Sequence, residues 1–566
     1  MTYLNIKAKQ QNTFDAIVVG SGISGGWAAK ELCEKGLKTL VLERGRSVEH
    51  IKDYPTANKF PWELPHRGRL TAAEYDSHPI QRKCYAFGED TKHFFVNDGD
   101  QPYTQIKGFD WIRGYQVGGK SLLWARQCYR LSPMDFEANA RDGVGVDWPI
   151  RYEDLAPWYD YVERFAGISG NRDGLPQIPD GQFLPPMEMT CVETHFADFL
   201  QRNFENRRMI IGRCANLTKS HLGRGPCQYR NLCHRGCPYG GYFSSNSATI
   251  PAAQKTGNLT LRPDSVVHSV IYDEQKGKAT GVRVIDANTK QMTEYYARIV
   301  FLNAATLNTT LIMLNSTSSR FPNGLGNDSG QLGHNLMDHN YRVRIYSEID
   351  GYEDRYYTGR RPNGTYIPRY QNLQKNDRPY LRGFAYGGGS WRGGWSRGIS
   401  EGGFGADLKD RLSEPGKWGF AMHGMGEMLP DYSNKVSLDT TKLDKWGMPT
   451  LKIDCEYKEN ELLMIKDMMA DAVEMLEAAG FKNVKAEDSK QFPGLGIHEM
   501  GTARMGRDPK TSVLNKNNQV WGVPNVFVTD GSCMVSSACQ NPSLTYMALT
   551  ARACDFAAGE LKRGNL

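Results

Sequence analysis

The chain has 566 residues, of which 40% are hydrophobic and 23% charged, and its formal net charge is +6. These values are typical of a globular protein, and the length predicts two or more domains. The small net charge, without basic runs interleaved with aromatic residues, argues against nucleic-acid binding. No apolar stretch is long enough to span a membrane. Residues 1–12 lack the apolar core of a secretory signal, so we expect a cytoplasmic protein unless an exported partner carries it to the periplasm.

The chain opens with a pattern that is typical of dinucleotide binding. An apolar run at residues 14–19 leads into glycines spaced G-x-G-x-x-G, and a helix-compatible stretch follows at 27–35. We expect Gly20 to permit the tight turn, Gly22 to let the backbone approach a pyrophosphate, and Gly25 to let the helix lie close to the strand. The partial positive charge of the helix N-terminus would then face the phosphates.

A second strand is predicted at residues 39–42, and it ends at Glu43. A carboxylate at this place suits the ribose hydroxyls of an adenosine and disfavours a 2′-phosphate. Ile23, between the second and third glycines, belongs to the same cradle. The pattern indicates a nucleotide cofactor but does not distinguish FAD from NAD.

The next part of the chain mixes loops and strands. A second glycine motif, at residues 113–121, lies in an aromatic, loop-rich region. The strand-like segments that follow predict a meander around Val267 and then a strand that leads into a helix ending near Met313. These segments are 259–262, 269–272, 280–285 and 297–302.

From about residue 345 the pattern changes to alternating strand-like runs with many aromatic residues, which predicts an antiparallel sheet that covers a pocket. Helical periodicity returns at 459–479, and the chain ends in a helix at 545–561. The order of elements predicts three segments in two domains. They are a cofactor domain at 1–345, which includes a cysteine-containing loop at about 205–245, a substrate-binding domain at 346–490, and a return to the cofactor domain at 491–566.

Three of the twelve cysteines are packed into that loop. Cys227, Cys233 and Cys237 are spaced C-x5-C-x3-C, and three thiolates so close in sequence can surround one polynuclear iron–sulfur cluster. A zinc ion would need a fourth ligand, for which His234 is conceivable but badly placed. Free or disulfide-linked cysteines are the third alternative. The other nine cysteines are scattered and resemble reduced thiols more than a disulfide framework.

Two segments near the end of the chain carry polar side chains that suit alcohol oxidation. His498 is followed by Gly501 and Thr502, and Asn541-Pro542 comes 43 residues after the histidine. Oxidising an alcohol requires a hydride to leave carbon while a proton leaves oxygen, and a neutral imidazole can accept that proton near neutral pH.

The remaining histidines show no metal-binding signature. His334 and His339 lie on either side of Asp338, in a segment that is typical of a turn. An apolar strand at 526–528 is followed by Asp530-Gly531, which would place a backbone amide and a carboxylate at the end of a strand.

Together these segments resemble the glucose–methanol–choline (GMC) oxidoreductases. The likeness runs from residue 15 to 556, and only Ala305, where the family usually has glycine, departs slightly. It implies an α/β fold in which an FAD-binding, doubly wound (Rossmann-like) domain is interleaved with a substrate domain built on an antiparallel sheet. It also implies alcohol oxidation at the flavin. The likeness rests on the first glycine motif, Val117-Gly118-Gly119, His498-x-x-Gly501-Thr502, Val528-Thr529-Asp530-Gly531 and Asn541-Pro542-Ser543-Leu544-Thr545.

The resemblance implies roles for individual residues. His498 would take the proton from the alcohol, and Asn541 would donate a hydrogen bond to the developing alkoxide. Asp530 and Gly531 would lie beside the ribityl chain and phosphates of the flavin. The residues implied in cofactor binding are Gly20, Gly22, Ile23, Gly25, Glu43, Gly118, Gly119, Ser121, Trp124, Val267, Asp530, Gly531, Pro542 and Ser543.

Within the family, the stretch at 117–124 is most similar to a sugar-oxidising branch that includes pyranose oxidase. In that enzyme a histidine binds the flavin covalently at the position of Leu123. Leucine cannot form this bond, so we expect the FAD to be bound non-covalently.

The cysteine spacing is also found in the catalytic subunits of bacterial FAD-dependent glucose and gluconate dehydrogenases, which carry a three-iron cluster. One departure is Gln228, where the glucose enzyme has an additional cysteine. The similarity implies a 3Fe-4S cluster at Cys227, Cys233 and Cys237, and a dehydrogenase rather than an oxygen-consuming oxidase. It further implies a c-type cytochrome as electron acceptor and a small companion subunit whose export would place the protein in the periplasm.

The substrate is expected to be a sugar or glucoside, and the preferred interpretation is oxidation of the C3 ring hydroxyl of glucosides or disaccharides to a ketone. Gluconate 2-dehydrogenase and a pyranose-oxidase-like enzyme that uses oxygen are the alternatives. A hydroxynitrile lyase would leave the three loop cysteines without a purpose. A non-catalytic flavin electron-transfer module is disfavoured by the pairing of His498 with Asn541.

Overall fold

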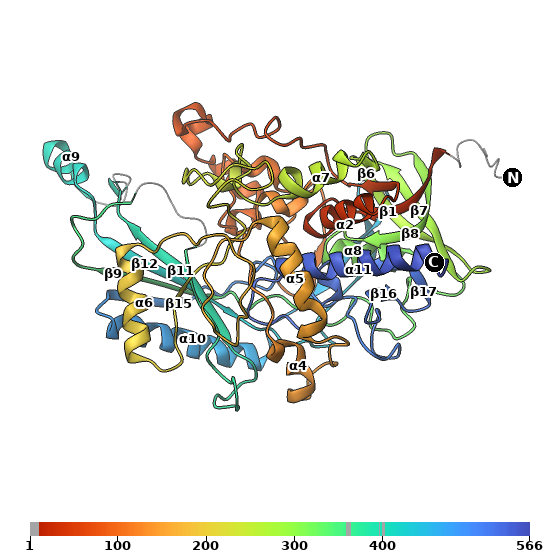
Figure 1. Ribbon diagram of the computed structural model, residues 1–566. Coiled ribbons are helices and arrows are strands. Elements are labelled where there is room, and N and C mark those ends of the chain that lie inside the picture. The colour runs from red at the N-terminus through yellow and green to blue at the C-terminus, as the bar shows by residue number, and fades with distance from the viewer. Residues whose placement is uncertain (1–10, 358–363, 395–396, 399–401) are drawn as a thin grey trace.

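The computed structural model describes residues 11–357, 364–394, 397–398 and 402–566. Two halves, each built on a sheet, lie next to one another (Figure 1). The first sheet lies on the right of the figure with α2, α8 and α11, and the second lies on the left with α6 and α10. The C-terminus is in the first half.

The first sheet is doubly wound. Strand β1 pairs in parallel with β2 on one side and with β8 on the other, so the direction of winding reverses at β1. Ligands of such sheets bind in the crevice outside the carboxyl ends of the strands at this switch point. The central order is β16 (Gln519–Val520), β17 (Val523–Val528), β8 (Met292–Leu302), β1 (Thr13–Val19), β2 (Thr39–Leu42) and β5 (Leu259–Arg262).

Helices α2 (Ile23–Glu34) and α11 (Ser543–Arg563) pack together over one face of this sheet. Alanines on both helices let them approach closely, and their apolar side chains cover Ala16 and Val18 of β1. Burial of β1 and β2 on both faces explains why their sequences are continuous apolar runs. Helix α2 begins four residues before the predicted start because Gly22 is its N-cap.

The predicted meander is present. Strands β6 (Ser265–Asp273) and β7 (Lys278–Asp286) pair antiparallel with one another, and β7 pairs antiparallel with β8. Helix α8 (Thr306–Asn315) follows β8, as expected from the sequence. The other helices of this part of the chain are α3 (Ala72–Ser77), α4 (Pro133–Asp142), α5 (Tyr152–Ala166) and α7 (Ile250–Lys255).

The second sheet is antiparallel. One of its faces packs on α6 (Cys191–Asn203) and α10 (Glu459–Ala478), in a core rich in phenylalanine and methionine. The opposite face is left to line a cavity. The strand order is β15 (Lys482–Asp488), β9 (Val343–Ile349), β12 (Trp418–Gly426), β11 (Phe384–Arg392), β10 (Thr365–Ile367) and β4 (Ile210–Ile211).

The predicted domain limits can be placed on these elements. The limit at residue 345 lies inside β9, and α6 and β4 join the second sheet although they precede that limit. A small third sheet contains β13 (Lys435–Leu443), β14 (Pro449–Asp454) and β3 (Thr104–Gln105), and α9 (Gly405–Ser413) projects at the upper left of Figure 1. The predicted α/β fold with an interleaved antiparallel sheet is confirmed.

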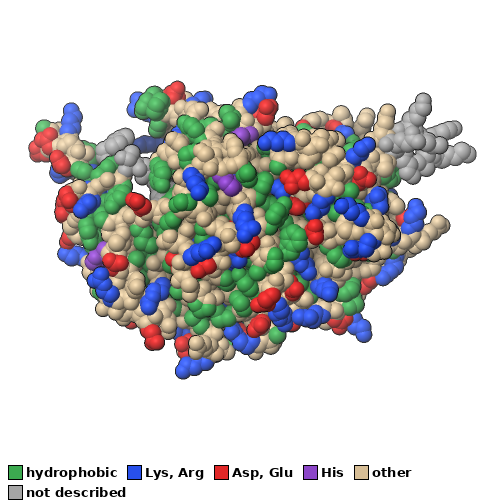
Figure 2. All heavy atoms as spheres, viewed as in Figure 1, with side chains coloured by type: hydrophobic (Ala, Val, Ile, Leu, Met, Phe, Trp, Pro, Cys, Tyr) green, Lys and Arg blue, Asp and Glu red, His purple; other side chains and the backbone are tan. Residues whose placement is uncertain are grey.

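The surface is of mixed charge on the face shown in Figure 2, where Lys and Arg are interspersed with Asp and Glu and separated by neutral side chains. This face has no continuous basic patch of the kind that nucleic-acid binding requires. In the described ranges, no helix is long and apolar enough to cross a membrane.

Candidate functional site

The three glycines of the first motif differ in their surroundings. Gly20 has a φ of 94°, and a Cβ atom there would lie 2.3 Å from the carbonyl oxygen of Asn303. A Cβ atom on Gly25 would lie 1.9 Å from the carbonyl oxygen of Gly20, so only glycine lets α2 start this close to β1. No atom lies within 4 Å of a Cβ placed on Gly22. Two of the glycines therefore permit close packing, and the third leaves the open space that a pyrophosphate needs.

Glu43 is fixed at the end of β2. Its carboxylate accepts hydrogen bonds from the Ser21 amide at 3.1 Å, the Ser21 hydroxyl at 2.6 Å and the Gly45 amide at 3.0 Å. Burial raises the pKa of Glu43, whereas these donors lower it. The side chain is thus pre-positioned at the rim of the cavity for the ribose hydroxyls of a dinucleotide.

A cavity of about 1380 Å³ lies between the two sheets. Most small-molecule sites occupy about 300–1,000 Å³, so this one has room for a dinucleotide and a substrate together. The predicted residues that line it are Gly20, Gly22, Ile23, Glu43, Gly119, Ser121, Trp124, Val267, Asp530, Gly531 and Ser543, with His498 and Asn541.

Three predicted cofactor residues do not line this cavity. Gly25 faces Gly20, as described above, and Pro542 is the N-cap of α11. Gly118 has a φ of 93°, and a Cβ atom on it would lie 1.7 Å from Oδ1 of Asn246. These residues shape the backbone around the site instead of facing a ligand.

The second glycine motif lies against the first: the Gly118 amide donates to the Ser21 hydroxyl at 3.0 Å, and a Cβ atom on Gly119 would lie 3.3 Å from Cα of Gly22. Gly119–Leu122 is a short 3-10 helix, and the Ser121 hydroxyl donates to the Gly118 carbonyl at 2.5 Å. Trp124 is held by a 2.9 Å hydrogen bond from its indole Nε1 to the Phe243 carbonyl. Leu123, at the position where covalent attachment occurs in pyranose oxidase, is buried and lines the cavity.

Several buried polar atoms that face the cavity have no hydrogen-bond partner among the described residues. They are Nδ2 of Asn303, Oδ1 of Asn541 and the hydroxyl of Tyr546. Buried polar groups are almost always paired, so these atoms indicate that a polar ligand occupies this space. The cradle, the ribose carboxylate and these unpaired atoms fit FAD.

His498 and Asn541 come together at the end of the cavity. Asn541 Nδ2 lies 3.4 Å from His498 Nε2, and both side chains line the cavity. The fold thus brings together two residues that are 43 positions apart in the sequence. Burial, followed by the nearby His339 and Lys120, lowers the pKa of His498 well below its ordinary value. The imidazole is therefore neutral at physiological pH and able to accept a proton.

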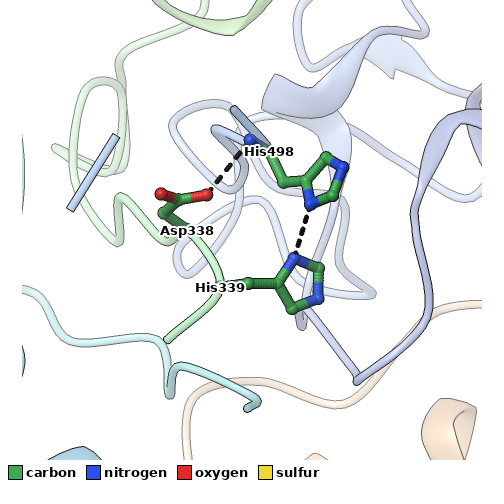
Figure 3. Close-up of side chains that lie close together, drawn as sticks. All are labelled: Asp338, His339 and His498. Carbon is green, nitrogen blue, oxygen red and sulfur yellow. Dashed lines mark hydrogen bonds between the residues drawn. The ribbon is translucent and has the colours of Figure 1, made fainter. Parts of the chain in front are cut away.

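His339 is a site residue that sequence reasoning missed. It contacts His498 from 159 positions away, with 2.9 Å between the two Nδ1 atoms (Figure 3). Its Nε2 lies 3.0 Å from the Ala538 carbonyl, which can only accept, so Nε2 carries the proton. His339 Nδ1 is then an acceptor for the Nδ1–H group of His498. With this tautomer, the lone pair of His498 Nε2 faces the cavity and accepts the long 3.4 Å hydrogen bond from the Asn541 amide, which a substrate hydroxyl can replace.

Asp338 fixes the loop that carries His498. Its carboxylate accepts hydrogen bonds from the amides of Gly494 at 2.7 Å, Gly496 at 2.9 Å and His498 at 3.1 Å. Burial and the nearby Glu499 raise the pKa of Asp338 to about 6, while the amides oppose that shift. Ile497 has a φ of 60°, which is unusual for a β-branched residue, and it directly precedes His498. The carboxylate thus holds a strained turn that aims the imidazole.

Asp338, His339 and His498 place one potential ligand atom each within 4.8 Å of one another, a spacing that a metal ion could use. Hydrogen bonding accounts for the arrangement better. Figure 3 shows one oxygen of the Asp338 carboxylate bonded to the backbone nitrogen of His498, and no bond from the carboxylate to either ring. Both of its oxygens accept amide protons, and the two rings are bonded to each other. The group therefore acts as a proton-ordering network.

The three loop cysteines are brought together. Cys227, Cys233 and Cys237 line a small cavity of about 30 Å³, and Cys233 also lines the large one. The Tyr229 amide donates to Cys227 Sγ at 3.5 Å, and the Gly241 amide donates to Cys237 Sγ at 3.3 Å. Amide hydrogen bonds to cysteine sulfur are typical of iron–sulfur sites.

Two further observations bear on what this loop can hold. In the parts of the chain that are described, the three thiols do not meet the 4.8 Å spacing of a single-ion site. Residues 206–263 also contain no Asp or Glu, although Asp90 from another part of the chain forms an ion pair with Arg235 of the loop. The excess of cations in the loop's own sequence would favour a thiolate-bound cluster.

The family follows from the sequence match as well as from this geometry. The GMC oxidoreductase family matches residues 15–341 and, with its C-terminal part, residues 430–550. The chain belongs to the GMC oxidoreductases. It is an FAD-dependent oxidoreductase that acts on the CH–OH groups of alcohols or sugars.

Known relatives cover nearly the whole chain. The 2-methyl-1,2-propanediol dehydrogenase of Mycolicibacterium austroafricanum is 30% identical over 96% of this chain and 94% of its own length. The fructose dehydrogenase large subunit of Gluconobacter japonicus is 26% identical over 97% of this chain and 98% of its own length. Among solved structures, a formate oxidase of Aspergillus oryzae has a TM-score of 0.60 at 16% identity, covering 98% of this chain and 99% of its own. At this level of identity, the likeness to the formate oxidase shows a shared fold only.

We predict that His339→Phe lowers the rate of flavin reduction by substrate about 10²-fold, because His498 loses the acceptor that fixes its tautomer. His339→Asn should restore part of the rate, since an amide can accept from His498 and donate to Ala538. Burial lowers the pKa of His339 to about 4, so in the wild type protonation of His339 should lower the rate only near pH 4, well below the pKa of about 6 of Asp338. Stopped-flow reduction as a function of pH measures these effects. Equal rates in the Phe and Asn variants would contradict the proton-ordering role.

Proposed function

We propose that this protein oxidises a ring hydroxyl of a sugar or glucoside, with the C3 hydroxyl of glucosides or disaccharides as the preferred position. The observation that carries the proposal is the lone pair of His498 Nε2, which faces the cavity beside Asn541 and is fixed by His339. FAD, when bound, supplies the acceptor for the hydride.

The chain's own residues handle the proton. His498 Nε2 takes the proton of the substrate hydroxyl, while its Nδ1–H group remains bonded to His339. The Asn541 amide has a second N–H group that can orient the substrate oxygen and stabilise the charge that develops on it.

The substrate class is supported by the similarity of residues 117–124 to the sugar-oxidising branch of the family and by the fructose dehydrogenase relative. Gluconate 2-dehydrogenase activity and a pyranose-oxidase-like reaction with oxygen are the alternatives within the sugar class. The diol dehydrogenase relative favours one further candidate, oxidation of a small vicinal diol.

The substrate experiment is anaerobic bleaching of the flavin spectrum with glucosides, disaccharides, glucose, gluconate and 2-methyl-1,2-propanediol. A glucoside or disaccharide should bleach the flavin fastest, and NMR of the product should show a ketone at C3. Fastest bleaching by gluconate or by the diol would replace the proposed substrate with that compound.

We also propose that electrons leave through a 3Fe-4S cluster held by Cys227, Cys233 and Cys237. The shared cavity, the amide donors and the absence of nearby acidic residues in sequence support this assignment. Cys233 lines both cavities, which puts the cysteine loop in the wall of the cofactor site. A one-electron carrier such as a c-type cytochrome would then be the acceptor.

A companion subunit and a periplasmic location form part of the same proposal. The fructose dehydrogenase relative is a large subunit, which supports assembly with a smaller partner. A partner that carries an export signal would bring this chain to the periplasm, where c-type cytochromes are available. In the absence of such a partner, we expect the chain to stay in the cytoplasm.

The FAD is predicted to be non-covalent, because Leu123 offers no atom for attachment at the position used by pyranose oxidase. Precipitation of the purified protein with acid should release all flavin into the supernatant. Flavin that stays with the pellet would contradict the prediction.

His498→Ala and Asn541→Ala are predicted to retain FAD and to slow flavin reduction, by about 10²–10⁴-fold for the histidine, as is usual for loss of a positioned base. The measurement is anaerobic stopped-flow reduction together with the flavin content of each variant. His334→Ala is the matched control, because this histidine packs on Tyr432 away from the cavity. A near-normal rate in His498→Ala would remove His498 from the mechanism.

Cys233→Ser is predicted to leave the flavin reducible by substrate but to cut electron delivery to a cytochrome or a one-electron dye. Iron analysis and low-temperature electron paramagnetic resonance should detect a three-iron cluster in the wild type, prepared anaerobically, and less of it in the variant. Cys191→Ser, a similarly half-buried cysteine outside the loop, is the control. Absence of iron, or unchanged turnover with one-electron acceptors in Cys233→Ser, would refute the cluster.

A further inference from the structure

A strip of the second sheet leads away from the catalytic end of the cavity. Strands β11 and β12 are paired antiparallel, and both line the cavity: β11 with residues 388–392, and β12 with Trp418, Ala421, His423 and Met425. The intervening residues of β12, such as Gly424, face Met468 of α10 instead. Three cross-strand pairs on one face make up the strip, namely Gly387 with His423, Gly389 with Ala421, and Trp391 with Gly419. Gly387 and Gly419 do not line the cavity themselves, because the rings of their partners cover them.

The strip has a ring at each end and small residues between them, over which the Glu193 carboxylate lies. The His423 ring lies over Gly387, where a Cβ atom would be 2.6 Å from its Nε2, and the Trp391 ring lies over Gly419, where the shortest such distance is 2.4 Å. Between the rings are Gly389 and Ala421. Glycine weakens a strand interior, and where it occurs there it often marks a place that a ligand approaches closely. The strip is therefore the floor of a groove.

The two ends of the groove differ. His423 is half-buried, lies next to Tyr341 and lines the same cavity as His498. Trp391 is 43% exposed and, among the described aromatic residues, is in no ring pair. Trp391 lies four positions after Gly387 on β11, which corresponds to roughly 13 Å of strand. A single six-membered ring held at His498 would not reach Trp391.

Polar groups border the groove beside Gly389. The Glu193 carboxylate lies 3.2 Å from a Cβ placed on Gly389 and accepts the Ser390 amide at 3.0 Å. The Thr190 and Ser390 hydroxyls are 2.6 Å apart beside it. A flat indole face with acceptors and hydroxyls at its edge suits a sugar ring, which presents C–H groups on its faces and hydroxyls around its rim.

We propose that this groove is a second binding site for the distal ring of a two-ring substrate, and that Trp391 stacks on that ring. The inference rests on the proposed function, because the first ring must lie at His498 and Asn541. It narrows the substrate class to disaccharides and to glucosides with a ring-shaped aglycone, and it names Trp391, Glu193 and the Gly389–Ala421 gap as determinants of specificity.

The test compares the holoenzyme with Trp391→Ala, using anaerobic flavin reduction by a disaccharide, by phenyl β-glucoside and by the single-ring methyl β-glucoside. The ratio of kcat/KM for two-ring over single-ring substrates should fall about tenfold in Trp391→Ala, mainly through KM, as loss of one aromatic stacking contact implies. Ala421→Phe, which fills the gap, should lower the same ratio. Trp62→Ala, a change at a 70% exposed tryptophan outside the cavity, is the control and should leave the ratio unchanged.

The outcomes separate the two proposals. If sugars reduce the flavin and the ratio is unchanged in both Trp391→Ala and Ala421→Phe, the distal site is wrong and the proposed function stands. If Trp391→Ala changes the KM for an aromatic electron acceptor but not for sugars, the groove serves the acceptor and the inference is overturned. If no sugar reduces the flavin of any variant, both the distal site and the sugar substrate are wrong.

Discussion

Three backbone amides of one loop, those of Gly494, Gly496 and His498, converge on the buried carboxylate of Asp338. A carboxylate so far from water is costly unless it is fully hydrogen-bonded, and these amides supply that compensation. The interaction joins the segment before the second sheet to the segment after it. It also forces the turn at Ile497 that directs His498 into the cavity. The catalytic end of the site depends on this contact.

The two halves of the molecule contribute different physical properties to the cavity between them. The first sheet offers backbone: glycines that permit close approach, the N-terminus of α2, and one carboxylate at Glu43. The second sheet offers side chains and a groove whose floor is glycine and alanine. A dinucleotide is held mainly by backbone and dipoles, whereas a sugar needs a specific outline of rings and hydrogen-bonding groups. This division of roles explains why the cavity lies between the two halves.

The electrostatics of the site favour neutral imidazoles. Burial lowers the pKa of His498 well below 6.5, that of His339 to about 4 and that of His423 to about 3. Near them, Lys120 forms a 3.0 Å ion pair with Glu499, so the lysine charge is compensated. A neutral His498 is the form that can take a proton from an alcohol. The cysteine loop differs, because its own sequence carries cations without acids, which suits an anionic cluster.

The sequence by itself determined the elements whose signals are local. The strand, glycines, helix and Glu43 of the cradle follow one another within 30 residues, so their roles could be assigned from spacing, and the structure places them as expected. The amphipathic helix α10 and the meander of β6 and β7 were also predictable, since side-chain periodicity reflects burial on one face. His498 and Asn541 were identified as a pair only through their resemblance to the family motif.

Only the tertiary structure decided which distant residues meet. His339 looked like part of a turn, and nothing near it in sequence indicates that it contacts His498, 159 residues later. Strand β4 pairs with the second sheet and α6 packs on it, although both precede most of its strands in the sequence. The groove from His423 to Trp391 likewise depends on pairing between two strands, β11 and β12. Such contacts are set by packing and hydrogen bonding between elements, and they leave no periodic pattern in either segment. That is why the sequence predicted the cofactor cradle in detail but the geometry around the catalytic histidine required the fold.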